Sequence, residues 1–248
     1  MSRAGRISLP IVDEAPAAHQ PTFLPTVDAL ERLWEEVSEK PLYAPPNFFR
    51  YLRLWWRMRL RLVKAEETRL IAPVGKVNHC SSCTDMCCVG PHSTVLLRLK
   101  DIATLVDIGR ADLIGGAKPS FTESTLAARS ALRRTIASQT WKVFPVLKQT
   151  SMGTCAALDN EGRCQIFPYW PLSCARFPYA LHSNGRDIFY SQRCDAFWLR
   201  SDVSGAIEAM TLKAIEAYNE GIKDWVLLAY APHRLQELGL TTYLHWPT

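Results

Sequence analysis

The sequence predicts an α+β fold in which helices flank a cysteine-rich, irregular middle containing short strands and hairpins. Apolar residues recur at helical spacing before residue 68 and after residue 201. Residues 141–200 are instead rich in aromatics, proline and cysteine, and carry turn signals. Hydrophobic residues make up 48% and charged residues 21% of the 248 positions, as in globular proteins that bury their own core.

Proline divides the chain near its start, since seven of the 16 prolines fall within residues 1–46. Residues 1–25 are therefore predicted to be an extended or poorly ordered leader. Residues 26–248 are predicted to form a single domain, with N-terminal helices over 26–68, a metal-binding cysteine region over 78–200 and C-terminal helices over 201–248. We see no signal peptide and no apolar run of membrane-spanning length, so we expect a cytoplasmic protein with no transmembrane segment.

Residues 26–40 are predicted to form the first helix, with Thr26 as its N-cap. Its apolar residues lie at helical spacing and form one stripe: Leu30, Leu33, Trp34 and Val37. A second helix is predicted over 45–68, and residues 50–64 of it hold six cations and no acid. Such a helix can contact nucleic acid, an anionic membrane surface or a protein partner. We favour the ordinary alternative, in which its apolar face packs on the core and its arginines are solvated.

The middle and the tail are predicted from shorter signals. A strand followed by a helix from about Asp101 is expected over 93–110, and another helix over 122–138. The turn signal at Asp159–Gly162 predicts a hairpin over 155–164 that brings its two terminal thiols to the same end. The prolines around Cys174 predict extended backbone there. Residues 207–222 are predicted to be helical, with Gly221 as a candidate helix end.

Eight cysteines are the strongest functional signal in the chain. Four of them lie within nine residues, where any disulfide would close only a tiny loop and would add little stability. In a reducing compartment, clustered thiols are more readily explained as metal ligands. The candidate ligands are Cys80, Cys83, Cys87, Cys88, Cys155, Cys164, Cys174 and Cys194.

Four segments together resemble a known family. They are CSSCTDMCC (80–88), LKDIATLVDIG (99–109), CAALDNEGRCQIF (155–167) and PLSCARFPY (171–179). This combination resembles the bacterial YkgJ-type CxxCxxCC cysteine-cluster family, whose members are described as zinc- or iron-chelating or iron–sulfur proteins. The resemblance implies a metal site and no defined activity. The chain departs from the family by one extra residue before Cys87, and by Trp170 where the family has arginine; Arg176 is the candidate replacement.

Thiolate ligands suit an iron–sulfur cluster, zinc or mononuclear iron, and do not suit calcium or magnesium. Three closely spaced cysteines with a distant fourth are the commoner layout of a [4Fe–4S] cluster, which we favour over zinc or mononuclear iron. Cys80, Cys83 and Cys87 have that compact spacing. Cys88 is expected to turn towards the second set of cysteines. His79 and His92 flank the loop as candidate nitrogen ligands, although surface histidines are the more favoured interpretation.

The sequence thus predicts a metal-binding protein, most plausibly an iron–sulfur protein for electron transfer, metal handling or structural support. The alternative is a zinc-stabilised binding module whose basic helix contacts nucleic acid, an anionic surface or a protein partner. Neither a nucleophile with its base nor a phosphate-binding loop is recognisable. Whether the protein is an enzyme is therefore left open at this stage.

Overall fold

The fold is α+β, as predicted from the sequence. The computed structural model describes residues 23–39, 62–71, 88–89, 94–116, 144–182, 185–190 and 204–245. Within these ranges the elements, in chain order, are α1 (Pro25–Glu39), η1 (Ala65–Glu67), β1 (Arg69–Ile71), α3 (Leu99–Asp107), η3 (Ala111–Leu113), β2 (Ile114–Gly115), β3 (Val146–Leu147), α6 (Leu172–Ala175), β4 (Tyr179–Leu181), β5 (Asp187–Tyr190), α7 (Ser204–Tyr230), α8 (Pro232–Glu237) and η5 (Leu240–Tyr243). Residues 1–22 of the predicted leader, most of 45–68 and the predicted helix over 122–138 lie outside these ranges. Pro25, the last residue of the predicted leader, instead begins α1.

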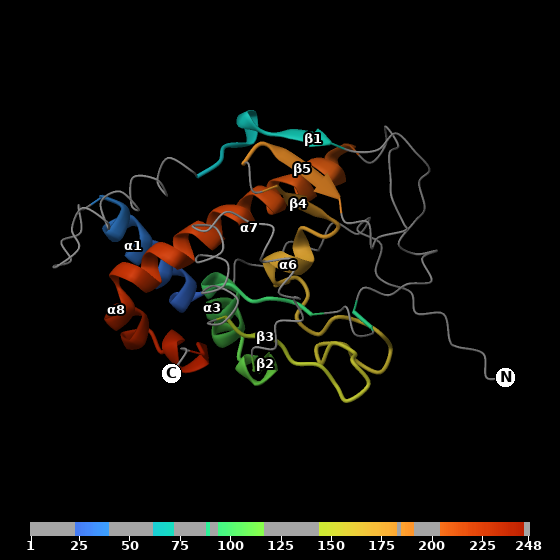
Figure 1. Cartoon of the computed structure of the whole chain (residues 1–248). Helices are drawn as coiled ribbons and strands as arrows, with labels where there is room; N and C mark the ends of the chain where they lie inside the picture. Colours follow the sequence, from blue (N-terminus) through green and yellow to red (C-terminus); the bar gives the residue numbers. More distant parts are fainter. Residues whose placement is uncertain are drawn as a thin grey trace, which may run out of the picture.

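The long helix α7 runs through the molecule and connects its two halves (Figure 1). A three-stranded sheet lies against one part of α7, with the order β1-β5-β4, β1 parallel and β4 antiparallel to β5. Tyr179 and Ile188 of this sheet pack with Ala214 and Ile215 of α7 in a small core. Among the described helices, none is both long enough and apolar enough to cross a membrane.

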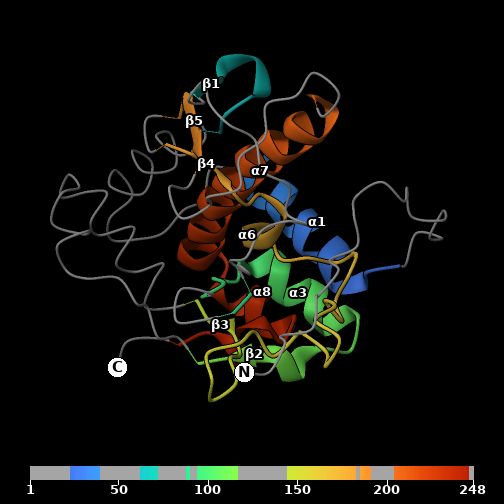
Figure 2. The ribbon, with the colours of Figure 1, turned by 90° about the vertical axis from the view of Figure 1, so that its right-hand side faces the viewer.

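Helix α3 lies at the centre of the larger core, beside α1 and α7 (Figure 2). Leu99, Ile102 and Ala103 of α3 are fully buried. Val27, Leu30, Leu33 and Val37 of α1 are buried in the same cluster. The apolar stripe predicted for the first helix therefore packs on the core, with Trp34 partly buried at its edge.

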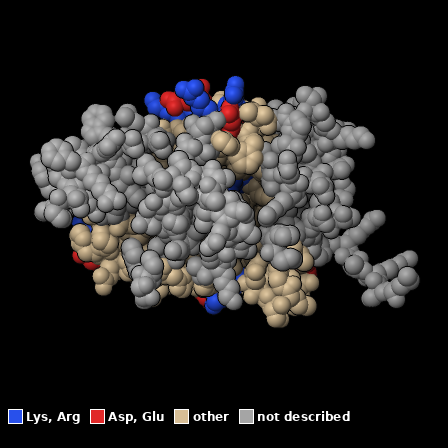
Figure 3. Space-filling model, in the orientation of Figure 1, with Lys and Arg blue, Asp and Glu red and all other residues tan. Residues whose placement is uncertain are grey.

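Ion pairs join the three helices on their outer side. Lys100 of α3 lies 3.4 Å from Glu31 and 3.0 Å from Glu216. Lys223 of α7 lies 3.1 Å from Glu31 and 2.7 Å from Glu220. At the sheet, Figure 3 shows basic and acidic side chains side by side along the upper edge, where Figure 1 places β1. Such a network, in which each lysine pairs with two glutamates, contributes more to stability than isolated surface ion pairs do.

The predicted cap of α1 is wrong. Thr26 does not cap the helix with its side chain; its own amide is capped by a residue far away in the sequence. Asp107, the last residue of α3, accepts hydrogen bonds from the amides of Thr26 at 2.9 Å and Val27 at 3.0 Å. The carboxylate also matches the positive end of the helix dipole, so α3 fixes where α1 begins.

The predicted helix over 45–68 is also wrong at its described end. Residues 62–64 are extended and lead into the short η1 and then β1. The amide of Val63 donates to Asn219 of α7 at 2.9 Å, and the carbonyl of Val63 accepts from the Asn219 side chain at 2.9 Å. The amide and the carbonyl of Val63 are thus both satisfied by one side-chain amide, which replaces the hydrogen bonds that a helix would make.

Gly221 does not end a helix, because α7 continues through it to Tyr230. A β-carbon at Gly221 would lie 3.0–3.2 Å from the guanidinium of Arg98. The glycine therefore makes room for Arg98 to cross the surface of α7. There Arg98 lies 3.7 Å from the buried carboxylate of Asp224.

The Asp107 cap makes the first prediction. We expect Asp107→Ala to lower the free energy of unfolding by ~1–2 kcal/mol, because the first amides of α1 lose their acceptor. Urea denaturation measures the change. Asp112→Ala is the matched control, since this side chain is 63% exposed and pairs only at the surface with Arg110. Equal losses in the two variants would contradict the capping role.

Gly221 makes the second prediction. Alanine in place of a helical glycine normally stabilises by about 1 kcal/mol. Here we expect Gly221→Ala to destabilise, because the new methyl group displaces Arg98 from Asp224. In an Arg98→Ala background the same substitution should stabilise. Thermal or urea unfolding of the four proteins provides the test, and one sign in both backgrounds would refute the packing explanation.

Candidate functional site: a cluster of cysteine thiols

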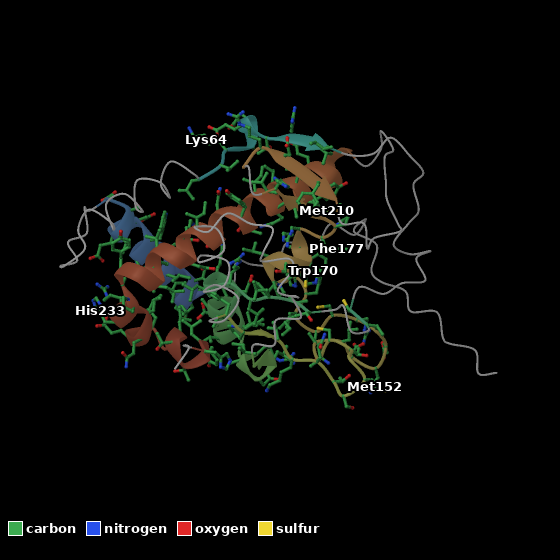
Figure 4. The ribbon with its side chains drawn as sticks, in the orientation of Figure 1. Lys64, Met152, Trp170, Phe177, Met210 and His233 are labelled. Atoms are coloured by element: carbon green, nitrogen blue, oxygen red, sulfur yellow. The ribbon has the colours of Figure 1, made fainter. Side chains whose placement is uncertain are left out.

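Cysteines from both sequence blocks lie near one another in the structure. The amide of Cys155 donates to the carbonyl of Cys88 at 2.8 Å, which places the end of the first block against the second. Cys88, Cys155, Cys164 and Cys174 are all free thiols. In Figure 4, sulfur atoms lie together beside the labelled Trp170, near α6. The hydrogen bond joins main-chain atoms, so the turning of the Cys88 side chain towards the second set of cysteines stays a prediction.

The loop before α6 presents two of the thiols. Cys155 pairs with Gln149 in an isolated antiparallel bridge, and Cys164 pairs with Leu158 in a second one. The turn between them is held by Asp159, whose carboxylate accepts from the amide of Arg163 at 2.8 Å. The predicted hairpin is therefore present. However, Leu158, not Cys155, lies opposite Cys164, because the paired part of the hairpin is shorter than expected.

Cys174 lies on the one-turn helix α6, and the expectation of extended backbone there is wrong. Pro171 itself is extended, with φ −53° and ψ 145°, and it is the N-cap, so the helix begins at the next residue, Leu172. Two hydrogen bonds fix α6, one to the segment that leads into α3 and one to α3 itself. Ser173 Oγ donates to the carbonyl of Leu96 at 2.8 Å, and the amide of Leu172 donates to Asp101 Oδ1 at 2.8 Å.

Burial and mutual repulsion raise the pKa values of Cys88, Cys155 and Cys174. The pKa of Cys88 is raised to about 11, mainly by burial and then by the neighbouring Cys155 and Cys164. Burial, followed by Cys164, raises the pKa of Cys155. The pKa of Cys174 is raised well above its ordinary value by burial, and then by Cys88, Cys155, Asp101 and Cys164. Nucleophilic cysteines need a lowered pKa, so this environment does not favour thiol catalysis.

Two charged residues, Asp101 and Arg176, lie near Cys174. Asp101 is 5% exposed, and its Oδ2 accepts from the amide of Arg98 at 2.8 Å. Burial raises the pKa of Asp101 to about 6, against the lowering effect of its hydrogen bonds from Leu172 and Arg98. Arg176 donates from Nη1 to the carbonyl of Tyr179 at 2.8 Å, which fixes its guanidinium two residues after Cys174. These groups are candidates for the electrostatic environment of the thiols.

Apolar side chains are exposed on the segments that carry the thiols. Four of the exposed large hydrophobic residues lie there: Val89, Met152, Phe167 and Trp170. The rings of Phe167 and Trp170 are 5.1 Å apart, and Trp170 lies next to the short helix α6 (Figure 4). Trp170, which departs from the family pattern, therefore extends an aromatic surface where an arginine would add charge.

The predicted ligand set is described only in part. Cys80, Cys83, Cys87 and Cys194 lie outside the described residues, as do His79 and His92 and residues 50–61 of the predicted basic helix. Within the described ranges, no group of three or more histidine, cysteine, aspartate or glutamate side chains is arranged to hold a metal ion. The described thiols thus influence one another electrostatically without forming a complete coordination site.

Comparisons of the chain with protein-family models, with curated proteins and with solved structures found no match. The resemblance to the YkgJ-type family therefore stays a prediction from the quoted motifs.

The sequence analysis did not single out the groups that hold the thiols in place. Asp101, Arg98 and Asp224 were missed because their roles depend on contacts between residues far apart in the chain. One signal was available: Asp101 and Asp107 are each followed by isoleucine within the family-like segment 99–109.

The buried Asp224 gives a prediction of pH dependence. Its Oδ1 accepts from the amide of Leu99 at 3.2 Å, whereas its Oδ2 has no hydrogen-bond partner among the described residues. Burial raises the pKa of Asp224 well above its ordinary value. In the unfolded chain Asp224 ionises at about pH 4, whereas in the folded protein it keeps its proton to a higher pH. The contribution of Asp224 to stability therefore falls as the pH rises from about 4 through the raised pKa.

We therefore expect the stability of the wild type relative to Asp224→Asn to fall as the pH rises from about 4 to 7. Urea denaturation of both proteins at several pH values measures the difference. Asp112→Asn, which removes one exposed carboxylate, is the control. Parallel stability curves for the wild type and Asp224→Asn would contradict this prediction.

Proposed function

We propose that this protein binds a metal centre through cysteine thiolates from both sequence blocks, and that the centre is an iron–sulfur cluster. The observation that carries the proposal is the contact between Cys88 and Cys155, with Cys164 and Cys174 close enough to interact with both. The centre would serve electron transfer, metal handling or structural support of an interaction surface. A cytoplasmic location, where thiols stay reduced, is part of this proposal.

The chemistry of the donor set supports a thiophilic metal. Four free thiols, one of them buried and three partly buried, lie on three separate segments of the chain that come near one another. Soft thiolate ligands favour zinc or iron–sulfur centres over calcium or magnesium. When such a centre is bound, it supplies either one-electron transfer or rigid structural cross-linking.

The proposal divides the adjacent pair of cysteines between two roles. Cys88 would belong with Cys155, Cys164 and Cys174, whereas Cys87 would belong with Cys80 and Cys83. The backbone hydrogen bond between Cys155 and Cys88 supports placing Cys88, which lies in a turn, with the second block. Cys194 completes the set of eight candidate ligands. The residues of this chain hold and shield the centre; no catalytic residue is assigned.

Mononuclear zinc or iron is the alternative occupant. The zinc form would be the structural core of a binding module, and its predicted basic helix would contact nucleic acid, an anionic surface or a protein. No described residue favours this second candidate over the first.

Metal analysis of anaerobically purified protein is the test. We expect brown protein that contains iron and acid-labile sulfide. Colourless protein with stoichiometric zinc would support the zinc alternative instead. Protein that carries no metal and takes up neither iron with sulfide nor zinc would overturn the proposal.

Cysteine variants test whether both blocks contribute. We expect Cys164→Ser and Cys174→Ser to lower the metal content as much as Cys80→Ser or Cys83→Ser, because each removes one thiolate. Ser151→Ala is the matched control, since it changes an exposed residue of the same loop. Full metal content in both second-block variants would show that Cys164 and Cys174 are not ligands.

A further inference from the structure

Helix α3 uses two aspartates in the same way, one at each end. Asp107 accepts the first amides of α1, as described above. Asp101 accepts the amide of Leu172, the first residue of α6. Both carboxylates thus hold the start of another helix, but α6 carries a candidate metal ligand, Cys174, whereas α1 carries no cysteine.

The bonds of Asp101 are buried and use both carboxylate oxygens. Oδ1 accepts from Leu172 and Oδ2 accepts from Arg98, each at 2.8 Å. Leu172 lies two residues before Cys174. A helix of one turn is not stable by itself, so the orientation of α6 depends on its bonds to the rest of the fold.

The charge of Asp101 is unfavourable for a neighbouring thiolate. It is one of the groups that raise the pKa of Cys174. If electrostatics alone mattered, a neutral or cationic residue would suit this position better. The hydrogen bonds to two backbone amides explain its presence, because an acceptor of this shape joins residues 98 and 172.

We propose that Asp101 is a positioning residue of the thiol site, holding α6, and with it Cys174, near Cys88, Cys155 and Cys164. This inference rests on the proposed function. Asp101 acts through the backbone of Leu172 and does not itself bind the metal. The same carboxylate also ties the site to α7, because Arg98 reaches Asp224 across Gly221.

The test compares Asp101→Ala with Asp107→Ala, two carboxylate deletions from one helix. Both should be destabilised, but only Asp101→Ala should bind metal more weakly. Residues that orient ligands typically change metal affinity ~10–100-fold, and we expect a loss of that size. The probes are Co²⁺, titrated into reduced metal-free protein under anaerobic conditions, and ferrous iron with sulfide for cluster assembly, all at a temperature where every variant is folded by circular dichroism.

The spectrum gives a readout that lost stability alone would not change. When Cys174 is misplaced, the thiolate-to-cobalt charge-transfer absorbance per bound cobalt should fall. For a cluster, the visible absorbance per chain should fall. Asp107→Ala should keep the wild-type spectrum and affinity.

Asp101→Asn provides a second variant that keeps the side-chain shape. Its single carbonyl oxygen can accept only one of the two amides, so its metal affinity should lie between those of the wild type and Asp101→Ala. If Asp101→Ala does not fold, Asp101→Asn against Asp107→Ala decides the question.

The outcomes separate the two proposals. Wild-type protein that takes up neither Co²⁺ nor iron with sulfide overturns the proposed function, and this inference with it. Wild-type binding with unchanged affinity and spectrum in the folded Asp101 variants overturns the positioning role alone. Equal loss of affinity in Asp101→Ala and Asp107→Ala also overturns it, because the effect would then follow stability and not position.

Discussion

The buried carboxylate of Asp101 joins two backbone segments that are far apart in the chain, and the arrangement of the thiols depends on it. One oxygen holds the start of α3 and the other holds the start of α6. A buried acceptor that loses its donors is unfavourable by ~1–3 kcal/mol for each group, so both segments must stay in place together. The helical core and the cysteine loops are therefore parts of one packing arrangement.

Helix α3 has this role because it is enclosed by other elements. Leu99, Ile102, Ala103 and Leu105 of α3 are buried, and its polar residues at each end find partners in neighbouring elements. Asp107 finds the amides of α1, Asp101 finds α6, and Arg98 finds Asp224 on α7. The resulting contacts place three other helices around one short helix. Because hydrogen bonds are directional, they fix the positions of these helices more closely than apolar packing alone would.

The parts of the fold that depend on local patterns were predictable from the sequence. The first helix, with its buried stripe, and the turn at Asp159–Gly162 agree with the structure. The parts that depend on distant contacts were not. Thr26 had the composition of a cap, yet Asp107 supplies the acceptor. Gly221 had the composition of a helix end, yet it accommodates Arg98.

The same limit applies to the candidate site. Clustered cysteines predict which residues would carry the chemistry, because thiols are chemically distinctive, and this stays a prediction. Their arrangement depends on main-chain bonds, such as that between Cys155 and Cys88, which leave no mark on residue type. The short helix α6 was missed for a related reason. The prolines around it restrict φ but do not determine whether the next residues turn or extend.

The position of α7 in the chain also sets the order in which the fold can be assembled during synthesis. Every cysteine precedes α7 in the sequence. All the cysteines are therefore synthesised before the helix that carries Asp224 and contacts both α3 and the sheet. Contacts across such long sequence separations form late, since the chain must first close large loops. Until α7 emerges, Arg98 lacks its buried partner, and the nascent chain passes through a stage in which its cysteines are present but their supporting framework is incomplete.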